Sequence, residues 1–159
     1  MEVSVVVSRC KPLFKYWRNL RYKYCLNLLD ASAGTLLDIG CSDGLFVNLA
    51  EKRGYEALGI DEEENVEVTK READIVTCFQ VLEHVENPIK AIENLKKLYH
   101  KQLIISVPNE PIFSLLRLGW DPQHLWAINP LVFKKYLGEP VLEKRIIMNR
   151  YYVAVWDRD

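Results

Sequence analysis

A chain of 159 residues, with 49% hydrophobic and 27% charged side chains, has the size and composition of one folded domain and not of a disordered protein. Its formal net charge of -1 argues against nucleic-acid binding over the whole surface, and no apolar run approaches the roughly 20 residues that span a bilayer. The four cysteines are scattered without a CxxC pair, which excludes a disulfide framework and a zinc ribbon and favours a reducing, cytoplasmic setting.

Residues 1–30 contain a predicted basic, amphipathic helix from Pro12 to Leu29. We expect a packed apolar face below a basic outer face, because both kinds of residue recur at helical spacing. The apolar positions are Leu13, Trp17, Leu20, Tyr24 and Leu28, and the basic positions are Lys11, Lys15, Arg18, Arg21 and Lys23. Such a helix could bind phosphates or RNA, but a solvated face is the more frequent meaning of this pattern.

Short apolar strands then alternate with helices. Strands are predicted at Thr35–Ile39, Ala57–Ile60, Ala73–Cys78 and Leu103–Val107, and helices at Leu45–Glu51, Pro88 to about Tyr99 and Pro130 to about Leu137. Two further strands, at about Val141–Met148 and Tyr151–Val155, follow one another closely. The pattern predicts an α/β fold with a doubly wound, mostly parallel sheet that ends in an antiparallel hairpin.

The most informative segment is Leu36–Gly44, an apolar strand that breaks into a tight loop. Such loops bring a ligand close to the backbone, where glycine leaves room for it. A dinucleotide loop needs the spacing GxGxxG, but Ser42 and Leu45 stand where its second and third glycines would fall. Asp38 and Asp43 would repel a pyrophosphate and favour a ligand with an ammonium and a sulfonium. An NAD-dependent oxidoreductase is therefore disfavoured.

The segment Asp38–Gly44 resembles the first motif of the class I S-adenosylmethionine (SAM)-dependent methyltransferases, with Ser42 at a position that is usually glycine. The run Cys78–Val85, followed by Asn87-Pro88, is similar to the Val-Leu-Glu-His-Val signature of the quinone and small-molecule O-methyltransferase branch. The resemblance implies a single methyltransferase-like domain over residues 1–159, with a Rossmann-like fold and SAM as cofactor.

The resemblance also implies which residues bind the cofactor. Asp61 ends the second strand and is expected to accept hydrogen bonds from the ribose hydroxyls, with Glu62 assisting. Asp38 is expected to reach the methionine end, although a turn or a cap is the alternative for each carboxylate. The predicted cofactor-binding residues are Asp38, Gly40, Cys41, Ser42, Gly44, Asp61, Glu62, Phe79 and Gln80.

His84 has three interpretations: a general base at the methyl acceptor, a residue that caps or packs at the start of the helix, or a metal ligand. Some relatives bind a divalent ion with a Glu-x-x-Glu-His pattern. Here Gln80 replaces the first glutamate and leaves Glu83 and His84. An amide oxygen is a poorer ligand than a carboxylate for a hard cation, so no metal site is predicted.

The irregular stretch 109–129 corresponds to the acceptor side of relatives. Its His124 is the first choice for a catalytic base, with Asp121 behind it. Trp120 and Trp126 could form an apolar wall for an aromatic, lipid or glycan acceptor, or they could belong to the core or an interface.

The region after the second strand is short. Relatives use it for a helix and a third strand, but residues 62–73 have room for only one of them. We therefore expect the edge helix to be missing and Val66 and Val68 to form at most a short edge strand. An open adenine side would weaken cofactor binding or require another chain to close it.

These features together predict a methyltransferase that acts by O- or N-methylation on a small-molecule, lipid, quinone or glycan acceptor. The alternative is a non-catalytic SAM-binding module, or a subunit that needs a partner or a second copy. An RNA methyltransferase, which would bind through the amino-terminal helix, is less favoured. No residue names the acceptor.

Overall fold

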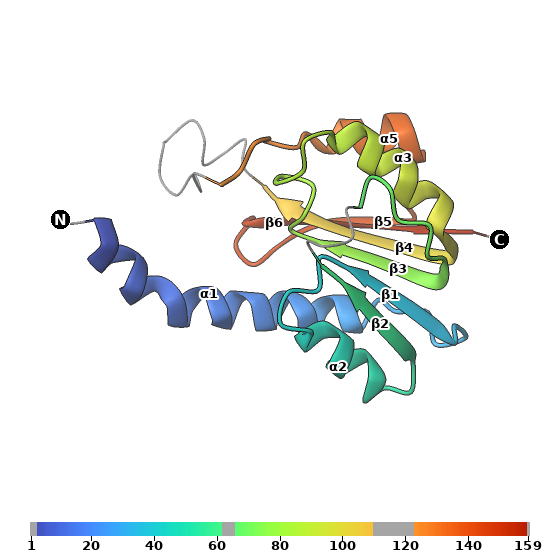
Figure 1. The fold of residues 1–159 in the computed structure, drawn as a ribbon, viewed down its shortest axis with the longest axis horizontal. Coiled ribbons are helices and arrows are strands. Elements are labelled where there is room, and N and C mark those ends of the chain that lie inside the picture. The colour runs from blue at the N-terminus through green and yellow to red at the C-terminus, as the bar shows by residue number, and fades with distance from the viewer. Residues whose placement is uncertain (1–2, 62–65, 110–122, 159) are drawn as a thin grey trace.

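The computed structural model describes residues 3–61, 66–109 and 123–158 (Figure 1). Its centre is a six-stranded sheet in the order β2-β1-β3-β4-β6-β5. The strands are β1 (Thr35–Ile39), β2 (Glu56–Ile60), β3 (Ala73–Phe79), β4 (Tyr99–Pro108), β5 (Leu142–Ile146) and β6 (Tyr151–Asp157). The first four are parallel, and β6 is antiparallel to both β4 and β5. The predicted α/β fold and its closing hairpin are confirmed.

Helices cover both faces of the sheet (Figure 1). The helices α1 (Val3–Leu26) and α2 (Leu45–Glu51) pack on one face, and α3 (Pro88–Leu98) and α5 (Pro130–Leu137) on the other. Both α3 and α5 begin at an Asn-Pro pair. The Asn87 side chain accepts a hydrogen bond from the Lys90 amide, and the Asn129 side chain accepts one from the Leu131 amide. Proline suits the next position because its ring is already fixed near helical geometry.

The faces of α1 differ from the prediction. Leu13 and Leu20 are exposed, and the buried residues near the carboxyl end of the helix are Arg21, Tyr22, Cys25 and Leu26. Arg21 was expected on the basic outer face. Its guanidinium instead lies 5.3 Å from the Tyr22 ring centre and 4.9 Å from that of Tyr151. Cation–π stacking stabilises a buried guanidinium, which helical periodicity alone does not reveal.

The short connection after β2 matches its prediction in the residues that can be described. Residues 66–72 form a turn and coil, and β2 is an outermost strand of the described sheet. Within the described parts of the chain, no helix is both long enough and apolar enough to cross a bilayer.

Candidate cofactor and active site

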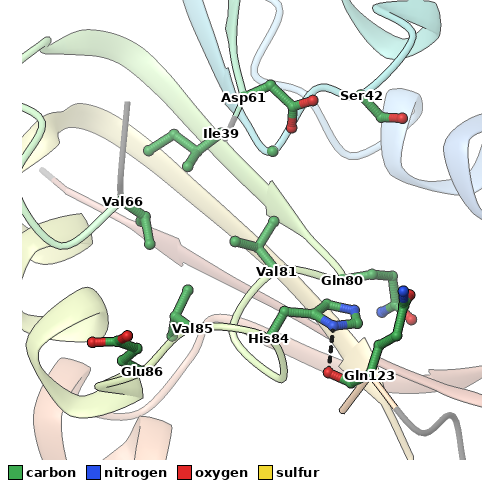
Figure 2. Close-up of a pocket in the computed structure, with 11 residues that line it drawn as sticks. Ile39, Ser42, Asp61, Val66, Gln80, Val81, His84, Val85, Glu86 and Gln123 are labelled. Atoms are coloured by element: carbon green, nitrogen blue, oxygen red, sulfur yellow. Dashed lines mark hydrogen bonds between the residues drawn. The ribbon is translucent and has the colours of Figure 1, made fainter. Parts of the chain in front are cut away.

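A pocket of about 610 Å³ lies at the carboxyl ends of β1, β2 and β3 (Figure 2). Its walls are the loops that follow these strands and the segment before α5. The lining residues are Ile39, Gly40, Ser42, Asp61, Val66, Gln80, Val81, His84, Val85, Glu86 and Gln123. Parallel α/β sheets bind ligands at this edge, and the volume is within the range of small-molecule sites.

The glycine loop, residues 40–44, is shaped by its backbone. Gly40 has φ +78°, and a Cβ there would overlap with Cγ2 of Val81, so the loop after β1 touches the loop after β3. The amides of Gly40 and Cys41 both donate to the Ile60 carbonyl, at 2.8 and 3.1 Å. Ser42 also has a positive φ of 48°, which explains why glycine is usual at its position.

A side chain of α1 also holds this loop. Arg18 donates to Asp43 at 2.8 Å, and Asp43 accepts a second hydrogen bond from the Leu45 amide. Burial alone would raise the pKa of Asp43, but these hydrogen bonds bring it below its ordinary value. Asp43 is therefore bound as a carboxylate to the loop and to α1, and it does not line the pocket.

Asp38 lies behind the loop. It is buried, it accepts a hydrogen bond from the Thr77 hydroxyl at 2.6 Å, and it is not among the residues that line the pocket. Burial raises its pKa to about 7, although the Thr77 hydroxyl and the Arg21 guanidinium act in the opposite direction. Its predicted contact with the methionine end of the cofactor stays a prediction.

The other predicted cofactor residues are placed as follows. Asp61 is exposed and lies beside Ser42 in the pocket (Figure 2). Gly44, with φ +69°, begins α2. Phe79 is buried against Tyr22 and Phe46, so its side chain does not reach the pocket. Glu62 lies outside the described residues.

Cys41, a predicted cofactor residue, packs against Gly59 of β2 and is not among the residues that line the pocket. Sequence reasoning missed the role of Gly59. A Cβ on Gly59 would overlap with the Cys41 side chain, so the second strand must carry glycine there. The isolated glycine within an apolar strand was the available signal, because such glycines mark a close approach.

Two of the chain's three histidines contact each other: His84, which lines the pocket, and His124, which does not. The rings of His84 and His124 have centres 4.8 Å apart. Figure 2 shows the other contact of His84, whose Nδ1 is 3.1 Å from the Gln123 carbonyl oxygen. The segment that carries His124 is fastened to the loop after β3, since the amides of Leu125 and Trp126 donate to the Glu83 carbonyl. The sequence named both histidines but gave no signal that they are neighbours. Asp121 and Trp120 lie outside the described residues.

The His84 end of the pocket offers a set of metal-ligating groups. Glu83 is fully buried, and ligand atoms of Glu83, His84 and His124 lie within 4.8 Å of one another. Sequence reasoning set a metal aside because of Gln80, and it did not include His124 in the set. These three residues could hold a divalent ion.

Trp126 belongs to a neighbouring pocket of about 400 Å³, which it lines together with Pro88, Ile128 and Val132. Its indole N–H donates to the Val85 carbonyl at 2.9 Å. Trp126 is therefore not among the residues that line the cofactor pocket.

Comparison with known proteins identifies the family of this chain. The family model described as a methyltransferase domain matches residues 16–136. The chain belongs to this methyltransferase family. A ubiquinone biosynthesis O-methyltransferase of Aliivibrio fischeri is 24% identical, over 92% of this chain and 80% of that protein. The same enzyme of Alkalilimnicola ehrlichii is 32% identical, over 57% of this chain and 47% of that protein.

Solved structures show the same methyltransferase fold. Magnesium protoporphyrin IX methyltransferase of Synechocystis PCC 6803, with bound S-adenosylhomocysteine (SAH), has a TM-score of 0.67 and 15% identity, over 89% of this chain and 84% of that one. A Haloferax volcanii putative methyltransferase, solved in complex with the Trm112 activator, has a TM-score of 0.68 and 10% identity, over 97% and 94%.

SAM is the cofactor of this methyltransferase, and the pocket fits it. Gly40 lines the pocket, and its lack of a side chain lets the loop after β1 lie directly against Val81 of the loop after β3. Asp61 offers an exposed carboxylate, and Val66, Val81 and Val85 give the pocket an apolar lining. The short turn after β2 brings Val66 to the pocket, and the expectation of an open adenine side stays a prediction.

Proposed function

We propose that this methyltransferase transfers a methyl group to a hydroxyl of a small-molecule acceptor bound beside Gln80, His84 and Gln123. The observation that supports this is the contact of His84 with His124 at one end of the cofactor pocket. A hydroxyl acceptor must lose a proton as it is methylated, so it needs a base within reach. The similar ubiquinone biosynthesis O-methyltransferases give independent support for an oxygen acceptor.

In this proposal the cofactor supplies an electrophilic methyl group on a sulfonium. Asp61 accepts hydrogen bonds from the ribose hydroxyls, and the backbone of Gly40–Gly44 lies against the methionine half. Val66, Val81 and Val85 contact the adenine. Asp38 acts from behind the loop, where its hydrogen bond with Thr77 joins β1 to β3.

The two histidines would act on the acceptor. One imidazole takes the hydroxyl proton while the acceptor oxygen faces the methyl group. The hydrogen bond between His84 and the Gln123 carbonyl fixes one ring, which limits the directions from which an acceptor can approach.

The test is methyl transfer from isotope-labelled SAM to quinol, sugar, lipid and RNA acceptors. We expect one hydroxyl class to be methylated, and His84→Ala and His124→Ala to lower kcat by about 10²–10⁴-fold with unchanged SAH affinity. His100→Ala, at an exposed position of β4, is the matched control. Transfer that persists at full rate in both histidine variants contradicts the proposal. Loss of activity on chelation, restored by Mg²⁺, would reassign Glu83, His84 and His124 to a metal site.

A second candidate is a SAM-binding subunit that needs a partner. Leu58, in the outermost described strand β2, is 46% exposed, and the Haloferax neighbour of the same fold was solved with an activator protein. SAH binding without transfer to any acceptor class would favour this function. The free thiols of Cys25, Cys41 and Cys78 support the expectation of a cytoplasmic setting.

A further inference from the structure

The segment Val66–Thr69, called here the 66–69 turn, belongs to the short connection between β2 and β3. The alignment with the Aliivibrio relative runs over 189 positions, more than the 159 residues of this chain, so that relative carries segments which this chain lacks. In this chain the turn sits where β2 and β3 are joined, and Val66 lines the cofactor pocket. A short turn has little regular hydrogen bonding of its own, so something else must hold it in place.

Side chains from α3 hold the turn. The Asn94 carboxamide nitrogen donates to the carbonyl oxygens of both Val66 and Thr69, at 2.8 Å each. An amide NH₂ has two donors, and the distances match full hydrogen bonds at both. Asn94 therefore closes the two ends of the turn with one side chain.

A second clamp joins the turn to the start of α3. Glu67 accepts a hydrogen bond from the Asn87 amide at 3.0 Å, and its other carboxylate oxygen lies 3.4 Å from Nζ of Lys90. Because Asn87 caps α3, the turn is fixed to the same helix end that follows the His84 loop. The 66–69 turn and the loop that carries His84 are therefore both held at the beginning of α3.

The turn matters to the pocket through a single side chain. Val66 is 3% exposed and packs in the core cluster with Ile39 and Ile60, and it also lines the pocket together with Val81 and Val85. A shift of the turn would move Val66 away from these valines and widen the pocket on that side.

We infer that Asn94 is a positioning residue for cofactor binding: it holds the 66–69 turn, and with it Val66, at the adenine side of the pocket. The inference rests on the proposed placement of the cofactor. Asn94 itself does not line the pocket, so it acts through Val66.

The experiment is a double-mutant cycle on SAH affinity, measured by calorimetry, with adenosine as a second probe. Asn94→Ala and Val66→Ala should each weaken SAH and adenosine by about tenfold, and the double variant should be no weaker than the worse single variant. Glu93→Ala, on the exposed side of the same helix, should bind like the wild type. A purely structural role would lower the melting temperature but leave the affinities of the folded variants unchanged.

Three results overturn the inference. One is wild-type SAH affinity in folded Asn94→Ala, and another is additive losses in the double variant. If Asn94→Ala does not fold, two conservative variants replace it. Asn94→Asp removes both donors at nearly constant shape, and Val66→Thr makes this side of the pocket more polar at nearly constant volume. Unchanged SAH affinity in both of these variants is the third result that overturns the inference. Failure of the wild-type protein to bind SAH would overturn the proposed function as well. The outcomes above, in which the wild type binds SAH, would overturn only the inference about Asn94.

Discussion

The glycine loop and the 66–69 turn line the same pocket, but they are held in different ways. The loop is fixed by its own backbone: positive φ angles at Gly40, Ser42 and Gly44, and amides that donate to the end of β2. The turn is fixed from outside by Asn94 and Asn87, which lie on or before α3. The glycine loop can be recognised from its local sequence because its backbone conformation requires glycines. The position of the 66–69 turn cannot, because it depends on side chains that are distant in the sequence.

Gly40→Ala should have the largest effect. The new Cβ would overlap with Val81 while φ stays positive, so we expect a loss of about 2–4 kcal/mol in unfolding free energy and no measurable SAH binding. Gly54→Ala is the matched control, since its φ is +95° but nothing lies near its Cβ position. It should lose about 1–2 kcal/mol and keep SAH binding. Denaturant melts measure the unfolding free energy and calorimetry measures SAH affinity. Equal losses in the two variants would contradict the close contact between Gly40 and Val81.

Asp38→Asn should change how stability depends on pH. The pKa of Asp38 is about 7 when folded, against 3.8 for an ordinary carboxyl, so the folded state keeps a proton that the unfolded state releases. Unfolding free energy therefore falls as pH rises from about 4 to about 7, by a magnitude on the order of 3 kcal/mol, and stays low above that.

The asparagine variant keeps an acceptor for Thr77 but cannot ionise, so it should lose this pH dependence and be the more stable protein at pH 8. Urea melts across the pH range compare the two. Parallel curves for the variant and the wild type would show that Asp38 is already ionised in the fold.

Ser42→Gly should have the smallest effect. Ser42 is exposed at φ 48°, and glycine relieves that strain while it adds freedom to the unfolded chain, so the two terms oppose each other. We expect a stability change within about 1 kcal/mol and a change in SAH affinity below about threefold. A larger loss of affinity would mean that the Ser42 hydroxyl itself binds the cofactor.

Much of the fold could be predicted because its signals are local. The limits of β1 and α2 follow from a short strand pattern, Thr35–Ile39, and from the loop that ends at Gly44. Strand β4 was predicted too short, since Tyr99–Gln102 pair with the beginning of β3 and only the partner strand makes them part of the sheet.

The candidate site was predictable in part for the same reason. Asp61 and Ser42 could be placed at the carboxyl edge from their positions after strands. The contact between His84 and His124 depends on hydrogen bonds of a distant segment to the Glu83 carbonyl, and the role of Val66 depends on Asn94. Arg21 was misplaced because its burial requires Tyr151, far along the chain.

The central claim is a SAM pocket at the carboxyl ends of β1, β2 and β3. Its most direct test is calorimetric titration of SAH into the wild type, Asp61→Ala and Glu56→Ala. Both carboxylates are exposed and lie at opposite ends of β2. Loss of hydrogen bonds from two ribose hydroxyls to a carboxylate should weaken binding at least about tenfold in Asp61→Ala, with Glu56→Ala unchanged. Equal SAH affinity in Asp61→Ala and the wild type would contradict the account.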